Sequence, residues 1–401
     1  MSNPSRIRLA ILRHAYFPGD VRVYKEAHAL ADSGCDVTVL CLRRPGEKSF
    51  EDDGHIHIHR IPLGRRRRSK ARYIIEYALS MILMAWRISR LAIHQRFDVI
   101  QVNTLPDLLV FVTLIPRMLG SRILIDLHEP TPELYETKYG NGTSRIIRHI
   151  LVFIEKHAIR FSHHALTVND TIRQRFIDRG APADKITVIR NVPSEDIFRP
   201  PKKHRLNCTS NFLLMTHGTL QPRYGQDVLI RALGQIRKSI PNIKLRIVGD
   251  GETEPELRRL AESLTCTDIV EFTGRVPIQE IPEYLIHADV GVVPLSRSPF
   301  SGLCQPNKLF EYVAFKVPVI AARVPAIEET FDNKCICYYE PGNQEDLSRA
   351  VIELYQSAEK RQSMVERAYK KYQVLRWNIT KQVYLQAIER LVGRSLNGGE
   401  I

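Results

Sequence analysis

The amino-acid sequence predicts an α/β protein with two domains, each built on a doubly wound parallel sheet. The first observation is that short apolar segments, typical of buried strands, alternate with longer amphipathic segments, typical of helices. The second is that this alternation occurs twice, on either side of a break rich in proline and lysine at residues 199–204. The third is the length, because 401 residues are enough for two separate hydrophobic cores.

The first half of the chain is expected to form one set of strands. His55–His59 alternates strictly between histidine and isoleucine, which predicts a half-exposed strand. Val21–Ser33 is predicted to be a helix, and Gly34 stands where many helices end in a left-handed glycine. Five further segments are predicted to be short buried strands: Ile7–Leu12, Val37–Leu42, Asp98–Asn103, Arg122–Leu127 and Ile186–Arg190.

The second half repeats the pattern. Gln226–Lys238 is predicted to be a helix, because its apolar residues at 228, 229, 232, 233 and 236 form one stripe at the helical period. In doubly wound sheets ligands bind beyond the carboxyl ends of the strands, so residues that follow strands are the first candidates for function. Six segments are predicted to be strands: Phe212–Thr216, Lys244–Val248, Ile269–Thr273, Asp289–Pro294, Val317–Ala321 and Cys335–Tyr339.

Positive charge is concentrated in the first hundred residues. The chain has a net charge of +14, and residues 1–100 carry 18 Lys and Arg against 10 Asp and Glu. The densest basic run, at residues 60–72 and including Arg65–Arg68, has no acid and precedes the apolar segment Tyr73–Trp86. That segment is too short, and too interrupted by Glu76, to span a bilayer. A basic cluster beside an apolar helix is typical of a protein that lies on anionic lipid.

Two other interpretations of the basic run stay open. It could be a solvated loop followed by a core helix, or a nucleic-acid site, although no aromatic interleaving or known binding module accompanies it. We therefore expect an anionic membrane surface, and no nucleic acid, as a partner. The seven cysteines form no CxxC pair, and the first residues lack the pattern of a secretory signal. These features predict a cytoplasmic protein, peripheral on the inner face of the membrane.

The segment His217–Gly225 follows a predicted strand and runs into a predicted helix. Its small residues, Gly218 among them, would let backbone N–H groups approach an anion at the positive end of the helix. Arg223 supplies a fixed charge suited to phosphate. A purely structural turn rich in glycine explains the segment as well. The spacing is neither G-x-G-x-x-G nor a Walker loop, so it predicts neither dinucleotide nor P-loop chemistry.

The segment Pro306–Ala321 places two charged residues three positions apart. Lys308 and Glu311 would share one helical face, where a cation could meet phosphate and a carboxylate could accept ribose hydroxyls. The alternative is an ordinary ion pair on a surface helix.

The second of these segments resembles the donor-binding helix of the family 4 glycosyltransferases, retaining enzymes of the GT-B fold. The family pattern reads roughly P-x-K-x-x-E-x-x-A-x-x-x-P-V-I/V-A. The resemblance covers nearly the whole chain, and the order and spacing of its pieces are more specific than any one of them. The other matching pieces are Asp20–Glu26, Asp126–Glu129, Ile186–Asn191, Ile247–Gly251, Phe272–Val276 and Ala288–Pro294.

The resemblance implies two Rossmann-like domains that face a central cleft. They would span residues 1–198, on the acceptor side, and 205–375, which bind the nucleotide sugar; a helix at about 376–396 would pack back on the first domain. Arg223 and Lys308 would hold the donor diphosphate. Glu311 would bind the ribose.

Further roles follow from the same resemblance. Gly274, Arg275 and Val276 would frame the base through backbone atoms. Gly19 would approach the transferred sugar or phosphate from the first domain. His128 would lie near the transferred sugar and the acceptor hydroxyl, with a capping or core histidine as the alternative.

Two positions depart from the family pattern, and both concern donor recognition. Leu303 stands where many members have a glutamate that orients the donor sugar. Tyr224-Gly225 stands where many have Lys-Gly, so Arg223 would hold phosphate one step earlier. The resemblance also implies metal independence, with no cofactor beyond the donor itself. His55, His57 and His59 share a strand face, but alternating histidines close poorly around one ion.

The sequence as a whole predicts a retaining glycosyltransferase. It would move a sugar from a nucleoside-diphosphate sugar to a hydroxyl acceptor, such as a lipid-linked or polysaccharide precursor. A sugar-nucleotide epimerase of the same fold is an alternative, which the apolar Leu303 disfavours. A non-catalytic scaffold subunit is another, which the intact Arg223, Lys308 and Glu311 disfavour.

Overall fold

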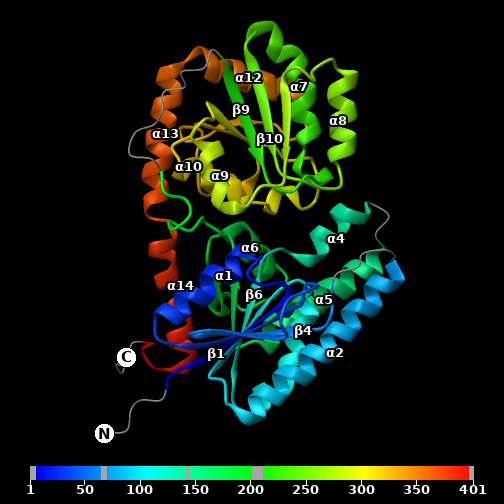
Figure 1. Ribbon diagram of the computed structural model, residues 1–401, viewed down its shortest axis with the longest axis vertical. Coiled ribbons are helices and arrows are strands. Elements are labelled where there is room, and N and C mark those ends of the chain that lie inside the picture. Colours follow the sequence, from blue (N-terminus) through cyan, green and yellow to red (C-terminus); the bar gives the residue numbers. More distant parts are fainter. Residues whose placement is uncertain (1–5, 65–69, 141–143, 201–210, 397–401) are drawn as a thin grey trace. The chain divides into compact units, whose positions relative to one another are not determined.

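The computed structural model describes residues 6–64, 70–140, 144–200 and 211–396 (Figure 1). The chain divides into two compact units. Unit 1 comprises residues 1–191 and 380–401, and unit 2 comprises residues 192–379. The sequence predicted the first division a few residues later, at the break 199–204, and the second a few residues earlier, at residue 376. The basic run Arg65–Arg68 lies outside the described residues.

Unit 1 is built on an eight-stranded sheet in the order β3-β4-β2-β1-β5-β6-β7-β8. Every neighbouring pair is parallel except β3 and β4, which are antiparallel. The strands are β1 Arg8–Tyr16, β2 Asp36–Leu42, β3 Phe50–Asp53, β4 Ile56–Ile61, β5 Val99–Asn103, β6 Arg122–Leu127, β7 His164–Thr167 and β8 Ile186–Val188.

The expectation of a wholly parallel first sheet is wrong at this edge. All four residues of β3 are exposed, so the strand has neither the apolar run nor the alternation by which strands are recognised. It forms because Gly54, with φ of +65°, turns the chain back to pair with β4. The short β7 was also not among the predicted strands. The predicted fold class itself is confirmed.

Helices connect the strands of unit 1. Helix α1 begins after Asp20, whose carboxylate accepts bonds from the backbone N–H groups of Arg22 and Val23, and Gly34 follows it with φ of +82°. The helices are α1 Val21–Asp32, α2 Lys70–His94, α3 Leu114–Met118, α4 Thr131–Tyr139, α5 Arg145–Phe161, α6 Asp170–Asp178 and α14 Trp377–Val392, with short 3₁₀ helices η1 Asp107–Thr113 and η2 Ala183–Lys185.

The C-terminal helix packs on the sheet of unit 1. The hydroxyl of Tyr384, on α14, donates to Gln101 Oε1 on β5 at 2.7 Å. Gln101 Nε2 in turn donates to Glu26 on α1 at 2.8 Å. Helices α1 and α14 therefore cover the same face of the sheet. No helix in the described ranges is both long and apolar enough to cross a bilayer.

Unit 2 is built on six parallel strands in the order β11-β10-β9-β12-β13-β14 (Figure 1). All six predicted strands are present, within two residues at each end. They are β9 Phe212–His217, β10 Ile243–Val248, β11 Val270–Gly274, β12 Val290–Val293, β13 Val319–Ala322 and β14 Cys337–Tyr339.

The helices of unit 2 bury the apolar stripes that the sequence predicts. In α7 the five apolar residues of the predicted stripe, from Val228 to Ile236, are all buried. The helices are α7 Gln226–Ser239, α8 Glu254–Ser263, α9 Ile281–Leu285, α10 Asn307–Ala314, α11 Pro325–Glu328, α12 Gln344–Gln356 and α13 Ala358–Gln373, with 3₁₀ helices η3 Pro222–Tyr224, η4 Ile278–Glu280 and η5 Ser301–Leu303.

One glycine sets how closely α10 approaches the sheet. A Cβ at Gly291, on β12, would lie 2.4 Å from Cγ of Tyr312, a fully buried side chain of α10. We expect Gly291→Ala to lower the free energy of unfolding by about 1–3 kcal/mol, as overpacking does. Urea denaturation measures this. Gly234→Ala is the matched control, because Gly234 lies within α7 with open space around it; that change should stabilise by about 0.5–1 kcal/mol. Equal stability of the two variants would contradict the close approach.

Candidate functional site

Three glycines lie together at the carboxyl ends of β9, β10 and β11. The backbone N–H of Gly218 donates to the carbonyl of Val248 at 2.9 Å, and that of Gly249 donates to Gly274 at 2.8 Å. A Cβ at Gly249 would lie only 2.1 Å from the carbonyl oxygen of Gly218. At this end of the sheet the backbone segments are therefore in direct contact, and no side chain fits at Gly249.

Lys308 is a buried cation beside these glycines. It lies in the first turn of α10 and is only 7% exposed. Its Nζ has no hydrogen-bond partner among the described residues and lies 3.8 Å from where a Gly218 Cβ would be. Burial lowers the pKa of this amine to about 8, although Glu311 opposes the shift. A buried ammonium with unused donors is suited to receive an anion.

Glu311, one turn further along α10, is held by a chain of hydrogen bonds. His217, the last residue of β9, contacts Glu311 through Nε2 and the Tyr312 hydroxyl through Nδ1, the latter at 2.9 Å. The Tyr312 hydroxyl donates to the carbonyl of Met215 at 2.9 Å. Because a carboxylate can only accept, Nε2–H of His217 donates to Glu311, and the Tyr312 hydroxyl lies between the Met215 carbonyl and His217 Nδ1. Glu311 is thereby fixed through Oε2, while Oε1 has no hydrogen-bond partner in the described ranges.

The ring of Tyr224 lies near both Arg223 and Lys308. The Arg223 guanidinium lies 4.9 Å from the Tyr224 ring centroid and 5.5 Å from that of Phe300. Nζ of Lys308 lies 5.4 Å from the same Tyr224 ring. The tyrosine that replaces the family's lysine thus contacts both cations, and its ring stabilises their positive charge. Gly225 follows in the left-handed region, and a Cβ there would lie 2.9 Å from the backbone of Leu295.

The remaining predicted residues of unit 2 lie at the end of β11 and in η5. Gly274, with φ of +72°, turns the chain so that Arg275 is exposed and Val276 is half-buried. Leu303 is buried. An apolar side chain therefore occupies the position where the family pattern has a sugar-orienting carboxylate.

In unit 1, a buried polar network lies under the end of β6. The Asp126 carboxylate is fully buried and accepts from Arg22 Nε and Nη2 at 2.7 and 2.9 Å, from Asn103 at 2.8 Å and from His128 at 2.9 Å. Burial alone would raise the pKa of Asp126, but the charges of Arg22 and His128 hold it below its ordinary range. Burial raises the pKa of the neighbouring Glu26 to about 7, with Arg22 opposing.

This network orients His128. A carboxylate can only accept, so His128 Nε2 donates to Asp126, and in the neutral ring Nδ1 is then an acceptor. Nδ1 has no hydrogen-bond partner among the residues that the structure describes, and the side chain is 16% exposed. The geometry fits a histidine that receives a hydroxyl proton or hydrogen bond from a substrate.

Gly19 lies in a basic turn after β1. A Cβ at Gly19 would lie 2.7 Å from Nη2 of Arg44, whose guanidinium also lies over the ring of Tyr16. Arg13 pairs with Asp20 at 2.8 Å. Burial would raise the pKa of Asp20, but Arg13 and His128 lower it, so Asp20 also lies near His128.

The structure thus brings the predicted residues together in two groups. Lys308, Glu311, Gly218 and Arg223 gather in unit 2, close to Gly274. Gly19 and His128 gather in unit 1. Their roles remain predictions.

Several residues of both groups were not singled out from the sequence: His217, Tyr312, Arg22 and Asn103. His217 offered one usable signal, since it directly follows the predicted strand Phe212–Thr216 and precedes a glycine. Two of the three alternating histidines, His57 and His59 on β4, make other contacts. Nε2 of His57 pairs with Asp36 at 2.8 Å and Nδ1 with Asp52 at 3.3 Å, while His59 lies 2.9 Å from Arg87. No group of three potential metal ligands occurs in the described ranges.

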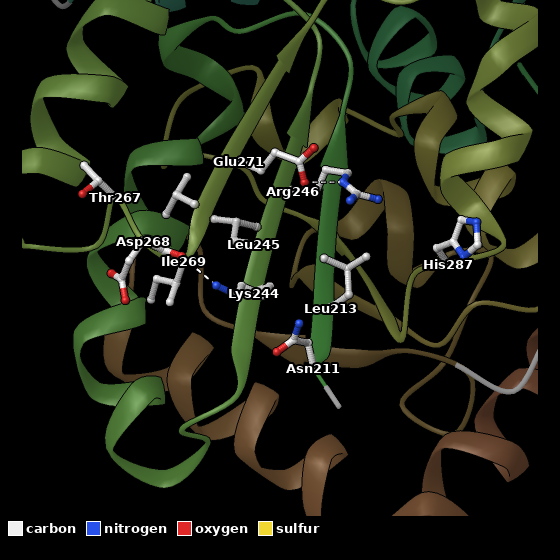
Figure 2. A pocket seen from close by; sticks show the side chains of 11 residues that line it. Asn211, Leu213, Lys244, Leu245, Arg246, Thr267, Asp268, Ile269, Glu271 and His287 are labelled. Carbon is white, nitrogen blue, oxygen red and sulfur yellow. Dashed lines mark hydrogen bonds and ion pairs between the residues drawn. The ribbon is translucent and has the colours of Figure 1, made fainter. Parts of the chain in front are cut away.

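Unit 2 has a hollow at the amino ends of three of its strands (Figure 2). It has a volume of 640 Å³ and is lined by the first residues of β9, β10 and β11, far from the glycines at their other ends. Its charged side chains are engaged with the protein. Lys244 donates to the carbonyl of Asp268 at 2.7 Å, and Arg246 pairs with Glu271 at 2.7 Å. The hollow therefore lacks the free cation that distinguishes the site around Lys308.

Comparison with known proteins identifies the class. The model of the group 1 glycosyl transferases matches residues 196–371, and that of the glycosyl transferase 4-like domain matches residues 19–192. The fold is that of GT-B enzymes: sucrose-phosphate synthase from Thermosynechococcus elongatus superposes with a TM-score of 0.81 at 18% identity, over 96% of this chain and 99% of that one. The chain belongs to the family 4 glycosyltransferases.

One sequence relative and one further solved structure are also similar to this chain. The GDP-mannose-dependent alpha-(1-6)-phosphatidylinositol monomannoside mannosyltransferase of Mycobacterium tuberculosis is 32% identical over 197 residues, which are 47% of this chain and 51% of that protein. Anabaena HepE in complex with UDP-glucose has a TM-score of 0.71 at 19% identity, over 96% of this chain and 99% of that one. The chain spans about half the length of the curated relatives that it matches.

The lowered pKa of Lys308 predicts a pH dependence. The amine is charged below a pH of about 8 and loses its charge as the pH rises through that value, so donor capture should weaken above it. The pH profile of kcat/KM for the donor, which reports ionisations of the free enzyme, measures this. Lys308→Arg, which stays charged, should flatten the fall near pH 8. The same fall in this variant as in the parent would assign the ionisation to another group.

Proposed function

We propose that the protein is a retaining glycosyltransferase that uses a nucleoside-diphosphate sugar as its donor. One observation carries the proposal: Lys308 is a buried ammonium with unused donors, one helical turn from a carboxylate that His217 fixes through one oxygen. Lys308 fits a diphosphate, and the second oxygen of Glu311 fits the hydroxyls of a ribose. A diphosphate and its ribose are adjacent groups, and Lys308 and Glu311 are neighbours on one face of α10, three residues apart.

The chemistry proposed for unit 2 is electrostatic. As the bond between the sugar and the diphosphate breaks, negative charge grows on the leaving phosphate, and Lys308 and Arg223 would stabilise it. These fixed cations would take the part that a divalent ion plays in other enzymes, so we propose metal-independent transfer. The acceptor hydroxyl would attack on the face from which the diphosphate leaves, and the leaving phosphate would take its proton.

The acceptor is proposed to be carried by a lipid. Relatives that match this chain are named for phosphatidylinositol mannosides as acceptors and GDP-mannose as donor, which supports a glycolipid substrate. His128 would contact the reacting sugar and the acceptor hydroxyl through Nδ1. Work on a lipid-linked acceptor would place the protein on the cytoplasmic face of a membrane, with Arg65–Arg68 near anionic lipid.

The kinetic prediction concerns α10. Glu311→Ala should raise the donor KM and lower kcat, because a hydrogen-bonded ribose contact is lost. Lys308→Ala should lower kcat by roughly 10²-fold or more, as removal of one preorganised charge-stabilising donor does. Lys238→Ala, at the exposed end of α7, is the matched control and should behave as the parent.

Turnover is measured with GDP-mannose, UDP-glucose and other nucleotide sugars, and NMR of the product gives the anomeric configuration. Retention is expected, and EDTA should not lower the rate. An inverted product would overturn the proposed mechanism. Conversion of the donor to an epimer without any acceptor would identify an epimerase instead.

A further inference from the structure

Helix α5 exposes a stripe of large apolar side chains. Ile146, Ile150 and Phe153 are 71, 51 and 61% exposed. Their spacing of four and three residues places them on one side of the helix. Soluble helices normally turn such a stripe toward the core, so this one is built for contact with something outside the chain.

The stripe lies on the outward side of α5. On the opposite side Glu155, Ala158 and Ile159 are buried, and Glu155 pairs with Arg179 at 2.9 Å. Burial raises the pKa of Glu155 to about 8, with Arg179 opposing. The helix thus buries its one acidic side chain and exposes its most apolar residues, the reverse of the usual arrangement.

Two neighbouring helices extend this apolar area. On α2 the exposed residues recur at the same spacing, while Met84 and Ile88 on its other side are buried. Helices α2 and α5 both pack against η1, and they contact the sheet at β4 and β6 respectively. In each helix the exposed stripe lies on the side opposite the buried residues. The exposed members are Ile75, Leu79, Ile82 and Trp86 on α2, and Leu114, Ile115 and Met118 on α3.

The three helices are in contact with one another, directly or through η1. The guanidinium of Arg117, on α3, lies 4.5 Å from the ring centroid of Phe161 on α5. Phe111, on η1, contacts the same ring at 5.2 Å, and α3 packs directly on α2. We call the exposed apolar residues of α2, α3 and α5 the apolar surface of unit 1.

The charged side chains beside the stripe of α5 are all positive, with Arg145 and Arg160 exposed and Lys156 half-buried. Arg145, Lys156 and Arg160 flank the stripe on one side, and none of them forms an ion pair within the described ranges. The acids of the helix and its neighbour face inward or are paired, as with Glu136, which binds Arg148 at 2.8 Å. An apolar stripe with only cations beside it is complementary to anionic headgroups over acyl chains.

We propose that the apolar surface of unit 1 docks on an anionic lipid bilayer. Apolar side chains of α5 and α2 would enter the boundary between headgroups and acyl chains, and Arg145, Lys156 and Arg160 would contact lipid phosphates. The inference rests on the proposed function, since a lipid-linked acceptor is reached only at a bilayer. It adds the surface that makes the contact, which is distinct from the run Arg65–Arg68.

The test is sedimentation of the full chain with vesicles of phosphatidylcholine alone or mixed with phosphatidylglycerol. The parent should bind the mixed vesicles, and Ile150→Ser with Phe153→Ser should bind at least about tenfold more weakly, because apolar area that drives insertion is removed. Leu264→Ser with Val374→Ser removes exposed apolar residues of unit 2 and is the matched control. It should bind as the parent does.

A second variant tests the charges. Arg145→Ser, Lys156→Ser and Arg160→Ser together should weaken binding to the mixed vesicles and reduce its salt dependence, because exposed charges are screened beyond about 8 Å at physiological ionic strength. Lys238→Ser with Lys334→Ser removes two exposed positive charges of unit 2 and is the control. Circular dichroism confirms that each variant is folded, as substitutions at exposed positions should leave it.

Three outcomes overturn the proposal. The first is that the parent does not bind the mixed vesicles, and the second is that the α5 variants bind them as the parent does. The third is that the parent binds no vesicles but forms a dimer, which the Ile150 and Phe153 changes dissociate. The last would make the surface a contact between two copies of the chain. Donor hydrolysis in solution separates this inference from the proposed function. The α5 variants should hydrolyse donor at the parent's rate, whereas a parent that binds vesicles but turns over no nucleotide sugar would refute the function alone.

Discussion

The buried ammonium of Lys308 is the constraint on which the rest of the unit 2 site depends. Removing a charged amine from water is costly, and its Nζ finds no hydrogen-bond partner in the described part of the chain. The surroundings offset this cost only in part, through Glu311 and the ring of Tyr224. Such a group is stable mainly when a negative ligand completes it, which is why we propose a binding site here rather than a structural ion pair.

The neighbouring backbone leaves room beside the buried ammonium. Glycine at 218 removes the side chain nearest to Nζ, and glycine at 249 lets the ends of two strands meet. His217 and Tyr312 fix Glu311 on the same side of α10. Unit 1 shows the opposite design, since Asp126 is saturated by Arg22, Asn103 and His128. Because the Asp126 carboxylate is already paired within the protein, this network holds His128 in place and, unlike Lys308, needs no charged ligand.

Much of this arrangement was predictable from the sequence, because it is local. The strand ends follow from short apolar runs, and Lys308 and Glu311 share a face because they are three residues apart on a helix. The partners were not predictable, because they come from distant parts of the chain. His217 and Glu311 are separated by 94 residues, and Arg22 and Asp126 by 104. Antiparallel β3 escaped prediction because its four exposed residues carry no apolar pattern.

The outward face of α5 was missed for a different reason. A helical period shows that a stripe exists but not which side of the helix meets the core. That choice is made by Glu155, which reaches Arg179 from α6 and so turns the apolar stripe of α5 outward. The basic first hundred residues had suggested lipid as a partner, and the exposed stripe offers a place for it that charge alone did not locate.

The most direct test of the account is whether unit 2 recognises a nucleoside diphosphate through Lys308. UDP, GDP and ADP are added separately to the parent, and the melting temperature is followed in the absence of divalent metal. A ligand at 100 times its Kd stabilises the folded state by about 2.7 kcal/mol. The account predicts that at least one of the three raises the melting temperature of the parent and that Lys308→Ala abolishes the rise. An equal rise in both proteins, or none in the parent at millimolar nucleotide, would contradict it.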